Sequence, residues 1–347
     1  MLDWNMAVDA DSPAPVMSSH TLTRIPEDRL AEALGEKAGD GQQAAAGGTI
    51  AAGLRALPKA DVHCHALLNC SLSTYEHVLG YKLPPPPPRF RDFGEFGGYL
   101  AANLFPAIRS LDGIRALLRA GLERMAGEGV VYAEASIDLL LPMHIHASPH
   151  AVIEVVAEER DRVAGQLRFV PEIGINRRVP PERLWPLFVA YLDSGVFGCV
   201  DLYDDERAGD LRGFQRFFQL ARERGLALKA HAGETCGPER VRDTLEILEV
   251  DAIQHGVAAV QDPRLLEELA RRGTQFNVGI ASNIALGVAG SYEDHPIHAL
   301  LAAGVNVALG TDDFAIFGAG LCDEIVRLRR SGMRLRDLAK VRFGPPA

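Results

Sequence analysis

A histidine and a glutamate stand close together at the end of one short apolar run, and this combination can do proton or metal chemistry. The run at residues 225–230 leads into His231-Ala232-Gly233-Glu234. A short apolar run after a helical segment predicts a buried strand, so these side chains would lie where a strand opens into a loop. His231 could be a metal ligand or a general base. Gly233 permits a tight turn that would bring Glu234 to the same substrate.

A pair of histidines lies near the start of the candidate barrel, in the segment 59–65. The alternation in this segment predicts a strand, in which His63 and His65 point to the same face. A second pair, His144 and His146, follows a strand-like run by several residues and lies between two prolines. We expect this second pair to form a loop or a helix cap rather than a metal site.

Strand-like runs alternate with helical patterns over most of the chain, which is typical of a parallel sheet with crossover helices. Eight such units over about 290 residues have the size of an α/β fold of the TIM (β/α)8 barrel type. Strands are expected at 59–65, 130–137, 167–175, 197–202, 226–231, 252–255, 274–280 and 305–310. Helices are expected at 111–126, 149–164, 211–224, 238–248, 263–272 and 295–303.

The candidate groups recur at the ends of these strands, where such barrels keep their active sites. Two histidines from the first strand, one from the fifth and a carboxylate from the eighth form a set that suits one zinc ion per chain. This set is His63, His65, His231 and Asp312. A metal in it would lower the pKa of its water to near 7. Glu234, His255 and Asp313 remain to handle protons.

A second metal would need a bridging ligand, commonly a lysine on the fourth strand that carries a carboxylate. The fourth predicted strand, residues 197–202, contains no lysine. Lys229 precedes His231 on the fifth strand and would point deeper into the barrel, so we expect a structural role for it.

Composition favours a small-molecule enzyme over a nucleic-acid or membrane protein. The formal charge is -10 and 47% of the residues are hydrophobic. Nucleic acids and anionic membrane surfaces attract clustered Lys and Arg instead. The five cysteines show no C-x-x-C spacing, which predicts reduced thiols and a cytoplasmic protein. The sequence shows neither a signal peptide nor an apolar run that would span a bilayer.

The chain divides into a leader and a barrel. Residues 1–52 are expected to form a flexible or partly helical leader, with a helix near 26–37 and a tract of small residues at 39–48. Residues 53–347 are expected to form the catalytic barrel. Five prolines within it precede aromatic residues that form either core or a wall over a pocket: Phe90, Phe93, Phe96, Tyr99 and Phe105.

Taken together, the motifs resemble the adenosine deaminase family of zinc amidohydrolases over residues 57 to 340. The resemblance lies in His63-x-His65, His231-Ala232-Gly233-Glu234, Gln254-His255-Gly256, Ser282-Asn283, Thr311-Asp312-Asp313 and the run Val200-Asp201-Leu202 before Asp205-Glu206. It implies that His63, His65, His231 and Asp312 bind zinc. It also implies that Glu234 protonates the ring nitrogen, that His255 orients or deprotonates the water, that Asp313 holds the attacking hydroxyl, and that ammonia leaves an aminopurine or related heterocycle.

The positions that would contact the substrate depart from the family pattern. After the first histidine pair the sequence has Asn69-Cys70, and Asp204 stands where the family commonly has glycine. We expect substrate contacts from Asn69, Asp204, Ser282 and Asp313, and a substrate that is not necessarily adenosine. Arg177 and Arg178, after the third strand, could meet an anionic group on the substrate, but the favoured interpretation is a solvated pair of loop charges.

Two other functional classes stay open at this stage. One is a mononuclear amidohydrolase that cleaves another C-N bond or an ester. The other is a non-catalytic metal-containing barrel that binds a ligand. Glu234 and His255 argue against the second, because a binding protein needs no proton shuttle.

Overall fold

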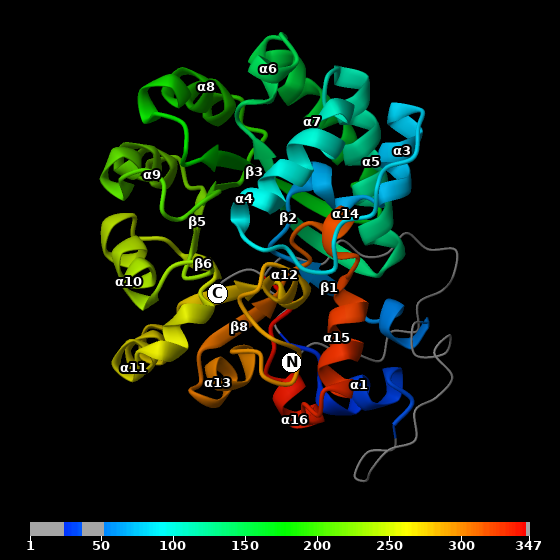
Figure 1. Ribbon diagram of the computed structural model, residues 1–347, viewed down its shortest axis with the longest axis vertical. Coiled ribbons are helices and arrows are strands. Elements are labelled where there is room, and N and C mark those ends of the chain that lie inside the picture. The colour runs from blue at the N-terminus through cyan, green and yellow to red at the C-terminus, as the bar shows by residue number, and fades with distance from the viewer. Residues whose placement is uncertain (1–23, 37–51, 345–347) are drawn as a thin grey trace.

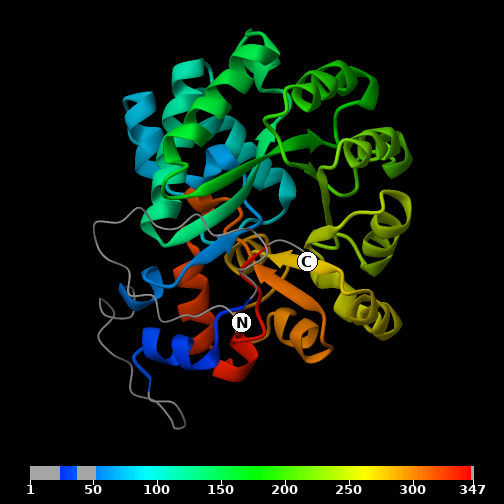
Figure 2. The same cartoon turned by 180° about the vertical axis from the view of Figure 1, so that it is seen from behind.

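The computed structural model describes residues 24–36 and 52–344 and contains one parallel sheet, shown from two sides in Figures 1 and 2. Eight strands follow one another in the order β1 to β8, each parallel to the next. This confirms the predicted TIM barrel. The strands are β1 (Lys59–Asp61), β2 (Val130–Asp138), β3 (Arg168–Asn176), β4 (Cys199–Tyr203), β5 (Ala227–Ala232), β6 (Ala252–His255), β7 (Gln275–Val278) and β8 (Asn306–Leu309).

Helices surround the sheet and return the chain from each strand to the next (Figure 1). The first half contains α1 (Glu27–Ala33), α3 (Leu72–Leu79), α4 (Phe93–Tyr99), α5 (Leu111–Gly127), α6 (Leu141–His144), α7 (Pro149–Val163) and α8 (Pro181–Asp193). The second half contains α9 (Gln215–Glu223), α10 (Pro238–Ile247), α11 (Pro263–Arg272), α12 (Ile280–Ala285), α13 (Ile297–Ala302), α14 (Phe314–Phe317), α15 (Leu321–Arg330) and α16 (Leu335–Leu338). Among these helices, none has the length and apolar character needed to cross a membrane.

Local sequence signals explain where several helices begin and end. Ser110 caps α5 by accepting a hydrogen bond from the amide of Gly113, and Asp262 caps α11 in the same way. Gly273 ends α11 in the left-handed conformation that glycine adopts without steric cost. The predicted helix at 211–224 is instead a short 3-10 turn, Leu211–Phe214, followed by α9.

The barrel closes between β1 and β8 at its carboxyl end, through the residues that carry the candidate ligands. Asp312 donates its main-chain N–H to the carbonyl oxygen of His63 at 2.9 Å, and Cys64 and Asp312 form an isolated parallel bridge. The segments after β1 and β8 approach each other closely, since a Cβ on Gly310 would lie 2.4 Å from the Cβ of His63. The predicted strand at 59–65 was therefore too long, because only single bridges continue β1 beyond Asp61.

A short N-terminal helix packs against the end of the chain. Ile25 and Leu30, around α1, are buried, and α1 lies beside α16 (Figure 1). The guanidinium of Arg329 on α15 pairs with Glu36 at 2.9 Å. The helix expected near 26–37 is present, and the small-residue tract at 39–48 lies outside the described residues.

The barrel interior contains a buried charged cluster around Lys229 of β5. The Nζ of Lys229 lies 2.5 Å from Glu134 of β2, contacts Glu172 of β3, and donates to the carbonyl oxygen of Val62 at 2.9 Å. The lysine is 1% exposed. Both neighbouring carboxylates pair with it, which supports the structural role predicted for Lys229.

Candidate active site

The four predicted metal ligands meet at the carboxyl end of the barrel. One ring nitrogen from each of His63, His65 and His231 lies within 4.8 Å of the others. Asp312 belongs to two overlapping groups of the same size, one with His63 and His255 and one with His65 and Asp313. Closure of β8 against β1 brings Asp312 to His63 and His65, although about 250 residues separate them in the chain.

Two of these histidines present buried nitrogens to the centre of the group. The Nδ1 of His63 lies 2.8 Å from the carbonyl oxygen of Asn277, so Nδ1 carries the proton and Nε2 carries the free lone pair. The Nε2 atoms of His63 and His231 are buried. That of His63 makes no hydrogen bond within the described residues, and that of His231 lies 3.3 Å from Oδ2 of Asp201. Burial and the nearby His255 hold the pKa of His63 well below its usual range. A neutral imidazole with a free lone pair, as on His63, fits a zinc ion.

Glu234 and His255 face each other beside the ligand group. The Nε2 of His255 lies 3.4 Å from Oε1 of Glu234 and 3.7 Å from Oδ2 of Asp312. Oε1 of Glu234 is buried and makes no hydrogen bond in the described part of the chain. This pair can therefore exchange protons with a bound molecule.

Asn283, which appears in the sequence only as part of the Ser282-Asn283 motif, contacts and orients this histidine. The Nδ2 of Asn283 lies 3.1 Å from Nδ1 of His255, and its Oδ1 lies 3.2 Å from Nε2 of His295. An amide that donates to Nδ1 leaves the proton of a neutral His255 on Nε2, toward Glu234. The signal in the sequence was the placement of Asn283 just after the seventh strand.

Burial and mutual repulsion perturb the carboxyl groups at this end of the barrel. Burial raises the pKa of Glu234 well above its usual range, and Asp312, Glu206 and Asp313 add to the shift. Burial also raises the pKa of Asp313 to about 7, with a further contribution from Asp312. Such shifts are common at functional sites, where titratable groups are buried beside like charges.

The backbone is strained at three of these positions. Asp204, His255 and Asp312 have φ angles of 80°, 64° and 54°, in the left-handed region that non-glycine residues rarely adopt. Each such residue costs about 1–3 kcal/mol, and these conformations persist where the surrounding structure enforces them. At these positions the strain directs side chains toward one centre.

A cavity of about 820 Å³ opens above these residues. His65, His231, Glu234, His255, Asp312 and Asp313 all border it. Its walls differ in character. Phe93 and Phe96 of α4, together with Phe105 and Phe317, form an apolar wall, whereas Asn176, Arg178 and Asp204 form a polar one.

The aromatic segment after the prolines therefore contributes both to the core and to the wall of the cavity, the two roles that the sequence left open. Phe93, Phe96 and Phe105 border the cavity, whereas Phe90 is buried and packs on Phe96 with ring centroids 5.4 Å apart. His144 at the end of α6 also borders the cavity. Within the described residues, neither His144 nor His146 belongs to a group that could hold a metal.

The structure brings only some of the predicted substrate contacts to the cavity. Asp313 and Asp204 border it, and Asp204 accepts a hydrogen bond from Asn176 at 2.7 Å. Asn69 is fully buried outside the cavity lining, where it lies 3.0 Å from the sulfurs of Cys64 and Met125. Ser282 is also buried away from the cavity and donates to the carbonyl oxygen of Gly279 at 2.9 Å.

Arg177 is not the solvated loop charge expected from the sequence. It is 2% exposed and donates from Nη2 to the carbonyl oxygens of Leu202 at 3.1 Å and His231 at 2.6 Å. The expectation fails because β3 ends at Asn176, which sends Arg177 inward against the neighbouring strands. Arg178 does lie at the cavity, 3.7 Å from Asp204.

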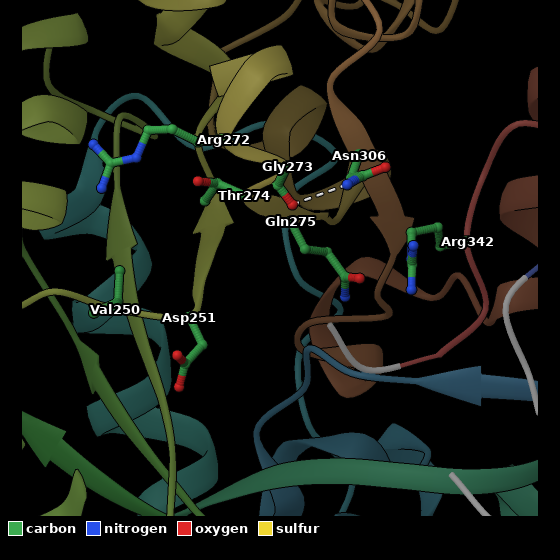
Figure 3. A pocket seen from close by; sticks show the side chains of 8 residues that line it. All are labelled: Val250, Asp251, Arg272, Gly273, Thr274, Gln275, Asn306 and Arg342. Carbon is green, nitrogen blue, oxygen red and sulfur yellow. Dashed lines mark hydrogen bonds between the residues drawn. The ribbon is translucent and has the colours of Figure 1, made fainter. Parts of the chain in front are cut away.

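A second cavity of about 380 Å³ lies at the opposite end of the barrel (Figure 3). It is bordered by residues at the amino ends of β6, β7 and β8, among them Asp251, Arg272 and Asn306. Asn306 donates to the carbonyl oxygen of Gly273 at 2.9 Å (Figure 3). The amino ends of barrel strands contribute stability rather than chemistry, so the candidate active site is the first cavity.

Comparisons of the sequence with known proteins point to one family. The family model for adenosine deaminase matches residues 88–342. A putative adenosine/adenine deaminase from Streptomyces virginiae is 36% identical over 294 residues, which cover 80% of this chain and 86% of the relative. An adenine deaminase from Agrobacterium fabrum is 30% identical over 281 residues, covering 77% and 86%.

Solved structures share the fold. The adenine deaminase from Arthrobacter aurescens superposes with a TM-score of 0.70 at 24% identity, covering 80% of this chain and 88% of that one. A zinc-bound amidohydrolase from Burkholderia ambifaria superposes with a TM-score of 0.71 at 21% identity, covering 88% and 87%. Together with the ligand group and the matched residues, these likenesses show that the chain belongs to the adenosine deaminase family, a family of metal-dependent hydrolases that act on the C–N bonds of cyclic amidines.

Proposed function

We propose that this protein is a zinc-dependent deaminase that releases ammonia from an amino-substituted purine or a closely related heterocycle. One observation carries the proposal: Glu234 and His255 lie 3.4 Å apart at the base of a large cavity, beside four converging metal ligands. The names of the relatives support the substrate class, since several are adenine or adenosine/adenine deaminases.

The residues that would hold zinc are His63, His65, His231 and Asp312. When bound, the ion would supply a hydroxide equivalent near neutral pH by lowering the pKa of a water molecule. The Nε2 atom of His63, which makes no hydrogen bond within the described residues, supports this assignment.

The chain's own residues would then move the protons. Glu234 would protonate the ring nitrogen next to the carbon that bears the amino group, which makes that carbon electrophilic. His255, with its proton on Nε2, would orient the attacking oxygen and stabilise the charge that develops there. Asp313 would accept the hydrogen bond, and then the proton, of the attacking hydroxyl. A C–O bond forms, the C–N bond breaks, and the amino group leaves as ammonia with the protons that these residues supply.

The buried position of Asn69 bears on specificity. Asn69 does not border the cavity, so it is not available to a ribose hydroxyl. Free bases and purines with substituents other than ribose are therefore the first candidates, and the adenine deaminases among the relatives agree with this choice.

The test is an ammonia-release screen of the zinc-loaded protein. The panel contains adenine, adenosine, deoxyadenosine, AMP, N6-substituted adenines, guanine, cytosine derivatives and aminopterins, with Glu234→Ala in parallel. We expect turnover of at least one aminopurine, and zinc content in Glu234→Ala equal to that of the wild type with no turnover. Hydrolysis of esters or non-aromatic amides without ammonia release from any heterocycle would overturn the proposal.

A further inference from the structure

The loop that carries His231 and Glu234 is held by a buried carboxylate that does not border the cavity. Oε2 of Glu206 accepts the main-chain N–H of Gly233 at 2.6 Å. Its Oε1 accepts those of Glu234 at 2.7 Å and Thr235 at 2.8 Å. One carboxylate thus binds three consecutive amides around Glu234, and hydrogen bonds of this charge-assisted kind are about twice as strong as neutral ones.

A buried cation holds the other end of the same loop. The Nη2 of Arg177 donates to the carbonyl oxygen of His231 at 2.6 Å and to that of Leu202 at 3.1 Å. These two carbonyls belong to the ends of β4 and β5, so the guanidinium links the strands just before the loop begins. The carboxylate of Glu206 stabilises the charge of Arg177.

The loop has little freedom apart from these contacts. Gly233 has a φ of +66°, and a Cβ there would lie 2.4 Å from Cγ2 of Val241. Arg240 of α10 donates a hydrogen bond to the main-chain oxygen of Glu206, which fixes the carboxylate's own backbone. The amide N–H groups of residues 233–235 consequently point at one acceptor.

We propose that Glu206 and Arg177 are positioning residues for the reaction. They fix the main chain of residues 231–235 so that His231 stays in the ligand group and Glu234 reaches the substrate from one direction. This inference rests on the proposed function, because it assigns a purpose to the geometry of Glu234. Neither residue borders the cavity, so both act through the loop.

The size of the expected effect follows from the geometry of proton transfer. A displacement of about 1 Å in a catalytic group can cost a factor of about 100 in rate. Glu206→Gln keeps the size of the side chain but offers one acceptor oxygen and an NH2 group to three amide donors. Part of the loop would lose its acceptor and turn away, taking Glu234 with it.

The experiment measures kcat, KM and zinc content for Glu206→Gln, Glu206→Asp and a matched control, Glu159→Gln. Glu159 is also a buried carboxylate held by arginines, but it lies on α7 outside the barrel. For Glu206→Gln we expect kcat to fall by about 10- to 100-fold while KM stays within about threefold and zinc content is unchanged. Glu206→Asp should recover part of the lost kcat, and Glu159→Gln should retain the wild-type kcat.

Cobalt substitution gives a readout that does not depend on turnover. Arg177→Met removes the donor to the carbonyl of His231, so the visible absorbance of the Co²⁺ protein should change in band position or intensity. Arg177→Lys should restore part of the wild-type spectrum. A Co²⁺ spectrum of Arg177→Met identical to the wild type, or a kcat of Glu206→Gln within twofold of the wild type, would overturn the proposal.

Two further outcomes separate this inference from the proposed function. If the wild type releases no ammonia from any compound of the panel, the proposed function fails, and the Co²⁺ spectra still decide whether Arg177 positions His231. If Glu206→Gln does not fold, Glu206→Asp decides instead. A wild-type kcat in that variant counts against the positioning role, and a reduced kcat with unchanged KM supports it.

Discussion

The barrel interior holds two clusters of buried ionisable side chains, one around Lys229 and one around His231, two residues further along β5. In the inner cluster, Lys229 pairs with Glu134 and Glu172, and the hydroxyl of Tyr132 donates to Glu134 at 2.6 Å. In the outer cluster, one nitrogen of His63 and one oxygen each of Glu234 and Asp313 lack hydrogen-bond partners in the described residues.

The difference lies in where the partners come from. The inner cluster balances its charges within the protein, as buried charges must when they only support a fold. The outer cluster leaves polar atoms unpaired toward a cavity, which costs about 1–3 kcal/mol for each buried group. A fold accepts this cost where a metal ion and a substrate complete the hydrogen bonds. The inner cluster has one such atom, Oε1 of Glu172, and that oxygen contacts the charge of Lys229. Several unpaired atoms around a common centre beside a cavity therefore mark the functional cluster better than burial or charge does.

A glutamate-to-glutamine substitution should mainly lower activity in the outer cluster and mainly lower stability in the inner cluster. The effect on activity is the larger one. Glu234→Gln removes the proton donor of the proposed reaction, so we expect kcat to fall by about 1,000-fold, or about 4 kcal/mol of activation free energy. The free energy of unfolding should stay equal or rise, because the substitution relieves repulsion from Asp312 and Asp313. Steady-state kinetics and urea unfolding of the same preparation measure both, and a clear loss of stability would show that Glu234 is structural.

In the inner cluster, Glu134→Gln should mainly affect stability. It leaves Lys229 with one carboxylate partner, and breaking a buried ion pair costs about 3–5 kcal/mol. We expect a loss near the lower end, about 3 kcal/mol, in the free energy of unfolding from urea titrations, with zinc content retained in the folded protein. Unfolding at the same urea concentration as the wild type would contradict the view that this cluster supports the fold.

Removing the metal should lower the free energy of unfolding of the protein through the outer cluster and not through the inner one. Zinc at about 100 times its Kd would add about 2.7 kcal/mol to the free energy of unfolding, because it binds the folded state. We therefore expect a lower Tm after chelation and recovery on adding Zn²⁺, measured by differential scanning fluorimetry. Mg²⁺ serves as the control, since it prefers oxygen ligands and should give no recovery. An unchanged Tm after complete metal removal would argue against the assigned ligands.

The smallest effect is expected at a third charged cluster, on the outer helices. Burial alone would raise the pKa of Glu159, but hydrogen bonds from Arg119 and Arg162 lower it from 4.5 to about 2. A carboxyl group whose pKa is lower in the folded state stabilises the fold at pH values above its unfolded pKa. This stabilisation is lost as the pH falls through its folded pKa. Glu159→Gln should therefore cost about 1 kcal/mol at pH 7, given its half-exposed arginine partners, and almost nothing near pH 2. Urea titrations between pH 7 and pH 2.5 test this, and a pH-independent difference would exclude an ionic origin.

Much of the site could be predicted from the sequence, because strand ends are recognisable in it. Each of His231, His255 and Asp312 follows or ends an apolar run, and parallel strands in a barrel bring their carboxyl ends together. The alternation around His63 also placed both histidines of the first strand on one face. These arguments need only local periodicity and the handedness of the fold.

The directions of loop side chains could not be predicted in this way. Arg177 lies just beyond β3 and Asn69 ends a single 3-10 turn, Ala66–Asn69, and at neither position does a periodicity define inside and outside. The sequence favoured a solvated Arg177 and a substrate contact for Asn69, whereas the structure buries both among main-chain carbonyls, sulfur atoms and arginines. Glu206 appeared in the sequence only as part of an acidic pair, and its three amide donors belong to another loop.

The sequence alone indicated the barrel and the candidate ligand residues, since these depend on hydrophobic periodicity and on which residues end each strand. Its motifs also resemble those of the adenosine deaminase family. Only the tertiary structure decided which polar atoms remain unpaired, which wall of the cavity is apolar, and which buried charges hold the loop of residues 231–235. Those features arise from contacts between segments far apart in the chain, such as His63 with Asn277 and Glu206 with Glu234. No local pattern encodes such contacts, because they exist only once the strands are closed into a barrel.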